Sequence, residues 1–259
     1  MNKTAAGSLF SYLHDKDIGA QGKMNKTLII SSQMHEEIKR ILGKACGKLI
    51  ELEPNPNLPT PVAAHPDMQI LIIDDTAVLT RGLYDTNSEL RSKLCSDLTV
   101  RFAEHAHTGV YPGDVGLNAL KIGKYLIAKS DSLDPEIKRL CVEKNIEIVN
   151  VKQGYAKCST LALDNAVITA DAGIAAAVHG LGFDALMITP GGITLEGYDY
   201  GFIGGASYYD SESKTVYFFG DITQHPDSIR IVDFLHSHGV DICQSAACTL
   251  ADFGGAVEV

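Results

Sequence analysis

The chain has 259 residues, 45% of them hydrophobic and 21% charged, which is the composition of a globular protein that buries a substantial core. The formal net charge of −10 and the absence of any basic run exclude a surface built to neutralise nucleic-acid phosphates. No stretch reaches the roughly 20 apolar residues of a membrane span. We therefore expect a small cationic ligand, with no nucleic-acid or membrane partner.

The N-terminal residues 1–23 are a poorly patterned extension without the apolar core of a secretory signal, and residues 24–259 are expected to form a single domain. In a chain of this size without a secretory segment, the six cysteines are expected to be reduced thiols. Both features predict a cytoplasmic protein.

The first predicted elements are a strand, a helix and a strand, in KTLIISS, HEEIKRILGKAC and KLIELE between residues 26 and 53. Four longer segments follow, and each begins with a turn-forming step and continues as two β-runs. Their equivalent positions, here called the repeat heads, are spaced 47, 44 and 49 residues apart and are Asp67, Asp114, Cys158 and Ser207.

Each pair of β-runs is followed by a predicted helix and a third strand. The helices are expected over residues 87–98, 134–145, 173–182 and 225–239. Asn87, Asp134 and Asp171 are placed to cap or precede three of them. The third strands are expected over residues 99–104, 146–151, 184–189 and 240–245.

The first unit lacks its leading strand, and the C-terminal GGAVEV at residues 254–259 fits as that strand. The predicted fold class is therefore α/β, a five-fold pseudosymmetric propeller of ββαβ units closed by the C-terminal strand. A doubly wound α/β sheet is the competing architecture, but it alternates single strands with helices.

Five such units resemble the pentein, or guanidino-group-modifying enzyme, superfamily over residues 24–259. The motifs GYAKCS, GYDYGFIGG and HPD are more closely similar to an uncharacterised clostridial-type family of that fold. The resemblance implies that the repeat heads line a central cavity. It also implies chemistry on a guanidino or amidino C–N group. Neither HEEIK nor HSHG has the spacing of a zinc site, so no metal or other cofactor is expected.

Residue by residue, the resemblance matches Asp67 to an acid that holds the guanidinium and Asp114 to the Asp of a Gly-Gly-Asp step. The catalytic Glu and His positions of the superfamily are occupied by Tyr111 and about Tyr155, and its C-terminal Cys position falls near Glu258. The usual Cys-His-Glu triad is therefore absent from those positions.

The catalytic candidates are Cys158, His65, Asp67 and Asp114. Cys158 is the cysteine at a repeat head, where the adjacent Lys157 would stabilise a thiolate, although alternation along a strand would turn the two apart. A structural thiol is the alternative. His65 and Asp67 would share a face of an extended segment as base and orienter. In the second HPD, Asp227 favours a helix start over chemistry.

Residues 191–207, GGITLEGYDYGFIGGAS, combine glycines that admit close backbone approach with aromatic and acidic side chains. We expect this segment to face the ligand, the alternative being a turn-rich connection that covers a sheet end. With Lys157, the expected substrate-binding residues are Glu196, Tyr198, Asp199, Tyr200 and Ser207.

Three functions remain open at this point. The first is a hydrolase or transferase that acts on a guanidino or amidino C–N group, with Cys158 as the nucleophile. The second is a binding protein that kept an acidic cavity without turnover, and the third is a protein-interaction module. Fold analogy alone does not decide among them.

Overall fold

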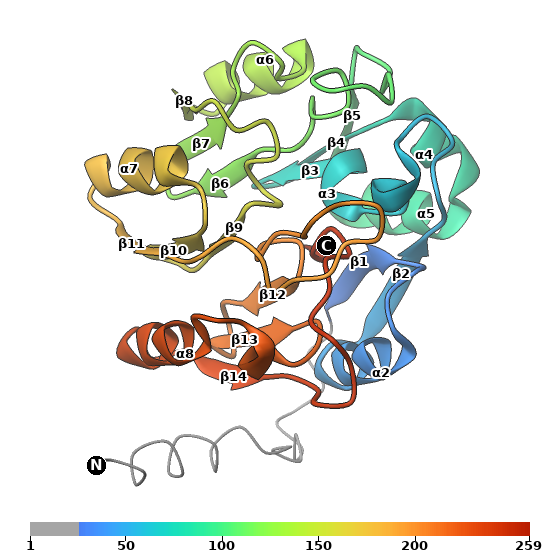
Figure 1. Cartoon of the computed structure of the whole chain (residues 1–259). Coiled ribbons are helices and arrows are strands. Elements are labelled where there is room, and N and C mark those ends of the chain that lie inside the picture. Colours follow the sequence, from blue (N-terminus) through green and yellow to red (C-terminus); the bar gives the residue numbers. More distant parts are fainter. Residues whose placement is uncertain (1–25) are drawn as a thin grey trace, which may run out of the picture.

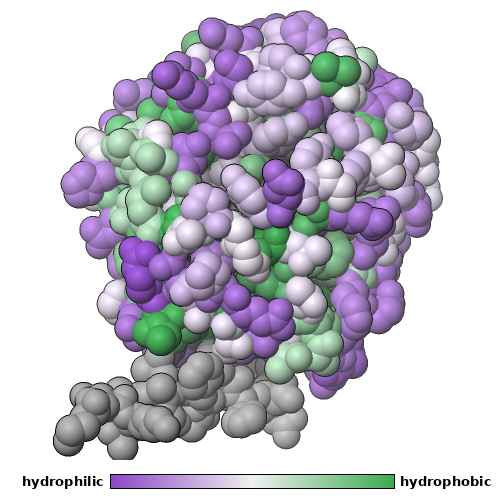
Figure 2. Space-filling view, in the orientation of Figure 1, coloured by the Kyte–Doolittle hydropathy of each residue, from purple (hydrophilic) through white to green (hydrophobic). Residues whose placement is uncertain are grey.

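A computed structural model describes residues 26–259, in which five three-stranded sheets surround a common centre and the helices that connect their strands lie at the periphery (Figure 1). The predicted extension at residues 1–23 lies outside the described residues. Hydrophilic side chains cover most of the face shown in Figure 2. Within residues 26–259 no helix has both the length and the apolar character needed to cross a bilayer.

The five sheets repeat one topology. In each, a first strand pairs antiparallel with a central strand, which pairs parallel with a third strand across a helical connection. In sheet order, the strands are β15 (Val257–Glu258), β1 (Thr27–Ser31) and β2 (Lys48–Leu52); β3 (Ile70–Ile73), β4 (Thr76–Leu79) and β5 (Thr99–Phe102); β6 (Leu120–Ile122), β7 (Tyr125–Ala128) and β8 (Glu147–Asn150); β9 (Thr160–Ala162), β10 (Ala166–Thr169) and β11 (Asp184–Met187); β12 (Ser207–Asp210), β13 (Thr215–Phe218) and β14 (Asp241–Cys243).

The C-terminal strand closes the ring, as the sequence predicts. β15 pairs antiparallel with β1, with Leu28 opposite Glu258 and Ile29 opposite Val257. Two backbone hydrogen bonds between Thr27 and Val259 extend this pairing by one residue pair at one end of the register. The architecture is the predicted five-unit propeller. A doubly wound sheet is excluded because, within residues 26–259, no strand joins one unit's sheet to the next.

The helices begin where capping residues occur. The side chains of Asn87, Asp134 and Asp171 accept hydrogen bonds from backbone amides in the first turns of their helices, as expected. The connecting helices are α2 (Glu36–Ala45), α5 (Ser88–Asp97), α6 (Pro135–Glu143), α7 (Ala172–Gly180) and α8 (Ser228–Ser237). Two shorter helices that the pattern did not predict are α3 (Pro66–Gln69) and α4 (Arg81–Thr86).

The hydrophobic core is divided among the boundaries between neighbouring units. One buried cluster joins Ile29 and Ile50 of the first sheet to Ile70 and Leu79 of the second, and four similar clusters lie at the other boundaries. The central strands β1, β4 and β10 are buried at every residue. Their apolar side chains point both to their own helices and to the next unit, so no unit buries its apolar surface alone.

A partly buried ion cluster ties the closing strand to the fifth sheet. Lys26 Nζ lies 2.7 Å from Asp210 Oδ1 and 3.1 Å from Glu258 Oε1, and Tyr208 donates a hydrogen bond to Glu258 Oε2 at 2.5 Å. Burial alone would raise the pKa of Asp210, but hydrogen bonds from Lys26 and Ser213 outweigh it and hold that pKa below its usual value.

We expect Asp210→Asn to lower the free energy of unfolding by about 2 kcal/mol at pH 7, because Lys26 loses a charge-assisted partner. An Asp with a depressed folded-state pKa contributes stability above its unfolded pKa, and that contribution is lost as the pH falls through the folded pKa. In urea titrations the difference between wild type and variant should therefore shrink below about pH 4. A difference that stays constant down to pH 2 would contradict this assignment.

Candidate functional site

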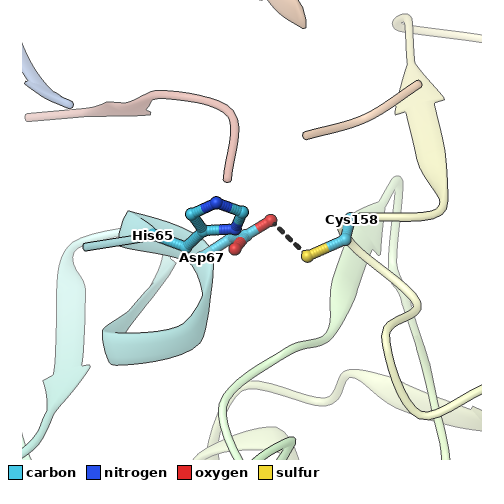
Figure 3. A group of neighbouring side chains, drawn as sticks. All are labelled: His65, Asp67 and Cys158. Carbon is cyan, nitrogen blue, oxygen red and sulfur yellow. Dashed lines mark hydrogen bonds between the residues drawn. The ribbon is translucent and has the colours of Figure 1, made fainter. Parts of the chain in front are cut away.

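Three chemically reactive side chains converge at the centre of the ring. His65 and Asp67 extend from the start of α3, and Cys158 reaches them from the turn before β9 (Figure 3). One ligand-type atom from each lies within 4.8 Å of the others, and all three residues are buried. The Cys158 thiol donates a hydrogen bond to Asp67 Oδ2, with Sγ 2.8 Å from the oxygen. The fold thus brings together three of the four catalytic candidates.

The local structure of these residues differs from the predicted extended segments. Pro66 occupies the first position of α3, where its missing N–H costs nothing, so His65 caps a helical turn and Asp67 lies within it. Residues 156–159 also form a turn, and β9 begins only at Thr160. Cys158 is therefore not on a strand, and the alternation argument for Lys157 does not apply.

Asn118 holds the cysteine and was not predicted. Its Nδ2 donates to Cys158 Sγ at 3.0 Å and to the Asp67 carbonyl at 3.2 Å. Its Oδ1 accepts from the backbone N–H groups of Lys157 at 2.9 Å and Cys158 at 3.3 Å. Asn118 lies two residues before β6, as Cys158 lies two before β9, so alignment on strand starts would have selected it instead of Asp114.

Asp252 is a second buried acid that sequence analysis missed. Its Oδ2 accepts from Phe202 N and its Oδ1 from Gly254 N, both at 2.9 Å. The same Oδ1 lies 3.8 Å from His65 Nδ1. Asp252 precedes the closing strand β15, in the head of the first sheet, where an acid could have been sought.

The electrostatics keep the thiol protonated. Burial, followed by the nearby charge of Asp252, raises the pKa of Asp67 to about 7. Burial, together with the carboxylates of Asp67 and Asp252, raises the pKa of Cys158 well above its usual value. Burial also lowers the pKa of His65. The raised Cys158 pKa runs opposite to the lowering that an adjacent Lys157 would produce, because burial and then the two carboxylates act on the sulfur.

Asp114 lies against Tyr155, whose hydroxyl donates to Asp114 Oδ2 at 2.6 Å. The Tyr155 ring packs between Tyr111, with ring centroids 5.7 Å apart, and Phe202 at 6.3 Å. Tyr111 and Tyr155, which the sequence analysis matched to the Glu and His positions of the resembled superfamily, are therefore neighbours. Cys158, for its part, hydrogen-bonds to Asp67 and Asn118 and not to Asp114.

The segment 191–207 contributes an exposed aromatic surface beside these rings. Tyr200 packs edge-on against Phe202, and Tyr198 and Tyr200 are exposed, as are Glu196 and Asp199. By contrast, the Ser207 hydroxyl is buried and donates to the Ile203 carbonyl at 2.7 Å.

The glycines of this segment serve close packing of the heads. A Cβ on Gly204 would lie 2.4 Å from the Lys157 carbonyl, and one on Gly205 would lie 1.9 Å from Asp252 Oδ1. The backbone at Gly204 and Gly205 makes the predicted close approach, and the atoms that it approaches belong to Lys157 and Asp252.

Two further features lie away from the three converging side chains. In the second HPD, His225 Nδ1 accepts from Asp227 N, and Asp227 begins α8 while binding Thr189 N and Arg230. A cavity of about 630 Å³ lies between residues 53–57, α4 and residues 103–107, and none of His65, Asp67 and Cys158 lines it.

A protein-family model matches residues 29–257, most of the chain. The chain belongs to the DUF6873 family. That family is described as a family of unknown function. No curated protein matches the sequence.

Solved structures share the fold of this DUF6873 chain. A dimethylarginine dimethylaminohydrolase adduct with S-methyl-L-thiocitrulline is 14% identical, with a TM-score of 0.55 over 85% of this chain and 92% of that one. SxtG, an amidinotransferase from Microseira wollei in the saxitoxin biosynthetic pathway, is 11% identical, with a TM-score of 0.52 over 86% and 77%. At these identities the comparison establishes the pentein-type fold.

We expect Gly254→Ala to destabilise the protein by roughly 1–3 kcal/mol, because φ at Gly254 is +75° and a Cβ there would lie 2.4 Å from His65 Cβ. Gly180→Ala, at the end of α7 with no atom within 4 Å of its added Cβ, is the control and should be neutral or slightly stabilising. Urea denaturation measures both, and equal effects at the two positions would contradict the packing described for the centre.

We also expect iodoacetamide at pH 7.5 to modify exposed Cys95 at least roughly 100-fold faster than Cys158 in the folded, ligand-free protein. Burial and the donated proton both protect the Cys158 thiol. Peptide mass spectrometry gives the rate at each cysteine, and urea should abolish the difference. Equal rates in the folded state would show that Cys158 is open to solvent.

Proposed function

We propose that the protein is a hydrolase or transferase that acts on a guanidino or amidino C–N group of a small cationic substrate. The observation that carries this proposal is the hydrogen bond from the Cys158 thiol to Asp67, 2.8 Å long and placed at the centre of the ring. A nucleophile within hydrogen-bond reach of a base is the arrangement that covalent catalysis requires. The folds of the dimethylaminohydrolase and of SxtG support the substrate class by analogy.

A cationic substrate would neutralise the buried negative charge of this site. Asp67 and Asp252 are both at least 96% buried, and the thiol lies beside them. A planar guanidinium donates paired N–H bonds to carboxylates, so it would be held by these acids and would offset their charge at the sulfur. The thiolate would then form only with substrate bound, which protects the free enzyme from side reactions.

The chemistry divides into two balanced steps. In the first, Cys158 Sγ bonds to the central carbon while its proton passes to Asp67, and the C–N bond breaks as the departing amine takes that proton. In the second, water or an acceptor amine attacks the same carbon and gives a proton to His65. The C–S bond then breaks and the sulfur regains a proton from His65.

The aromatic rings form the wall that a cation would meet on approach. Tyr155 and Phe202 pack in the same apolar cluster as Cys158, and the rings of Tyr111 and Tyr200 extend this surface outward to solvent. Aromatic faces attract guanidinium and ammonium groups. Glu196 and Asp199, which are exposed near Tyr198, are suited to attract the cation before it enters.

Non-catalytic binding of the same class of cation is the second candidate, and one observation favours it. Cys158 is only 2% exposed and its thiol is a hydrogen-bond donor, the state of an unreactive thiol. This candidate predicts binding without turnover.

The test uses the full chain, kept reduced and in a chelator, with a panel of guanidino and amidino compounds. Calorimetry measures binding, and release of ammonia or amine measures turnover. We expect Cys158→Ser to bind but to lose turnover by roughly 10³-fold or more, and Asp67→Asn to lose both. Cys95→Ser, a substitution at an exposed thiol, is the control and should match wild type.

Each outcome of these assays supports or rules out one of the two candidate functions. Turnover that survives Cys158→Ser would remove the proposed nucleophile. Binding by wild type without product would establish the non-catalytic candidate. If no compound binds, the guanidino proposal fails.

A further inference from the structure

The centre of the ring holds more buried negative charge than the described residues neutralise. Asp67 and Asp252 are 3% and 4% exposed, and Cys158 adds an ionisable thiol beside them. The charge of Lys157 acts on Asp67, but no salt bridge joins Asp67 to a Lys or Arg of residues 26–259. Buried charges in proteins are usually paired or bind metals, so this cluster lacks a cation.

Two unpartnered atoms mark the place where such a cation would bind. His65 Nδ1 and Asp67 Oδ1 are buried and have no hydrogen-bond partner within the described chain. Their residues are 2% and 3% exposed, so solvent does not satisfy them. A buried polar atom without a partner costs free energy, and two of them beside a thiol indicate a ligand that accepts electron pairs.

We infer that His65, Asp67 and Cys158 form a binding site for one thiophilic divalent cation of the Zn²⁺ class. An imidazole nitrogen, a carboxylate oxygen and a thiolate are the three kinds of ligand that Zn²⁺ takes, whereas Mg²⁺ and Ca²⁺ prefer oxygen alone. In Figure 3 the three side chains face one another across a short gap. Three protein ligands leave a fourth position open.

The distances require only small side-chain movements. Ligand atoms around tetrahedral Zn²⁺ lie about 3.3–3.8 Å apart. In the structure, Sγ and Asp67 Oδ2 are 2.8 Å apart, and the three ligand atoms lie within 4.8 Å of one another. The contact between Sγ and Oδ2 would open and any longer separation would close, each by about 1.5 Å or less. The metal would replace the proton that Sγ and Asp67 now share.

The surrounding residues suit a metal-bound thiolate. Asn118 Nδ2 already donates to Cys158 Sγ at 3.0 Å, and its Oδ1 fixes the cysteine backbone. Asp252 lies 3.8 Å from His65 Nδ1 and adds negative charge next to the site. Such outer contacts orient metal ligands and strengthen binding. Metal and guanidino substrate would compete for the same sulfur, so occupancy by metal would exclude the proposed reaction.

Cobalt(II) titration tests the inference without any guanidino compound. The full chain is first stripped with a chelator and kept reduced, and Co²⁺ is then added. We expect one equivalent to bind with the near-ultraviolet thiolate-to-cobalt charge-transfer absorption, which Zn²⁺ should abolish by displacement. Cys158→Ser should remove the absorption, and Asp67→Asn and His65→Gln should weaken binding at least about tenfold, since each loses one of three ligands.

Cys248→Ser is the matched control, because Cys248 Sγ lies 3.1 Å from His35 Nδ1 in another cysteine–histidine pair. It should leave the titration unchanged. The inference is overturned if wild type shows no charge-transfer absorption, or if the absorption survives Cys158→Ser or depends on Cys248. Circular dichroism checks the fold of each variant. If Cys158→Ser does not fold, unchanged affinity in folded Asp67→Asn and His65→Gln would overturn it.

The two proposals can fail separately. The turnover assay is run in chelator and the cobalt titration without substrate. Metal binding without turnover would support the cation site and overturn the proposed reaction. Turnover without metal binding would support the proposed reaction and overturn the cation site.

Discussion

Burial of apolar surface between neighbouring units is the interaction on which the rest of this structure depends. Each three-stranded sheet is apolar on more than one side, and each main core cluster is shared by two adjacent units. A row of five units would leave two such surfaces in water. Closure through β15 and β1 removes both ends at once, which explains why the last strand of the chain completes the first sheet.

Closure of the ring also determines which side chains are buried at its centre. The turns that lead into the five first strands are brought together, so their side chains are buried whether they are apolar or not. The polar ones are held largely by backbone groups: Asp252 accepts two amide hydrogens, and Asn118 accepts two more. Gly204 and Gly205 let the heads approach closely. Within the described residues, negative charge from Asp67 and Asp252 is left without a cation beside the Cys158 thiol. Both the proposed guanidino chemistry and the proposed metal site arise from this uncompensated charge.

The fold is shared with a dimethylarginine dimethylaminohydrolase and with the amidinotransferase SxtG. Tyr111 and Tyr155, which the sequence analysis matched to a Glu and a His of the resembled superfamily, form an aromatic pair beside Asp114. Glu258, near its C-terminal Cys position, is tied to Lys26 and Tyr208 at the ring closure. The reactive group is instead built from the second and fourth heads, with Asn118 of the third between them.

The sequence by itself determined the five-part repeat, the helices with their Asn87, Asp134 and Asp171 caps, and the return of the C-terminal strand. These features depend on local periodicity and capping, which neighbouring residues encode. It also singled out His65, Asp67 and Cys158, because each lies at or beside a repeat head. Asn118 and Asp252 were missed, since their roles depend on contacts with residues 39 or more positions away.

Only the tertiary structure decided the state of the cysteine. The sequence left open whether Cys158 is a thiolate stabilised by the adjacent Lys157 or a structural thiol. The fold instead places Asp67, 91 positions away in the chain, in hydrogen-bond contact with the sulfur, with Asp252 close by. Electrostatic interaction in a buried site depends on distance in space and on exclusion of water, and neither can be read from positions along the chain.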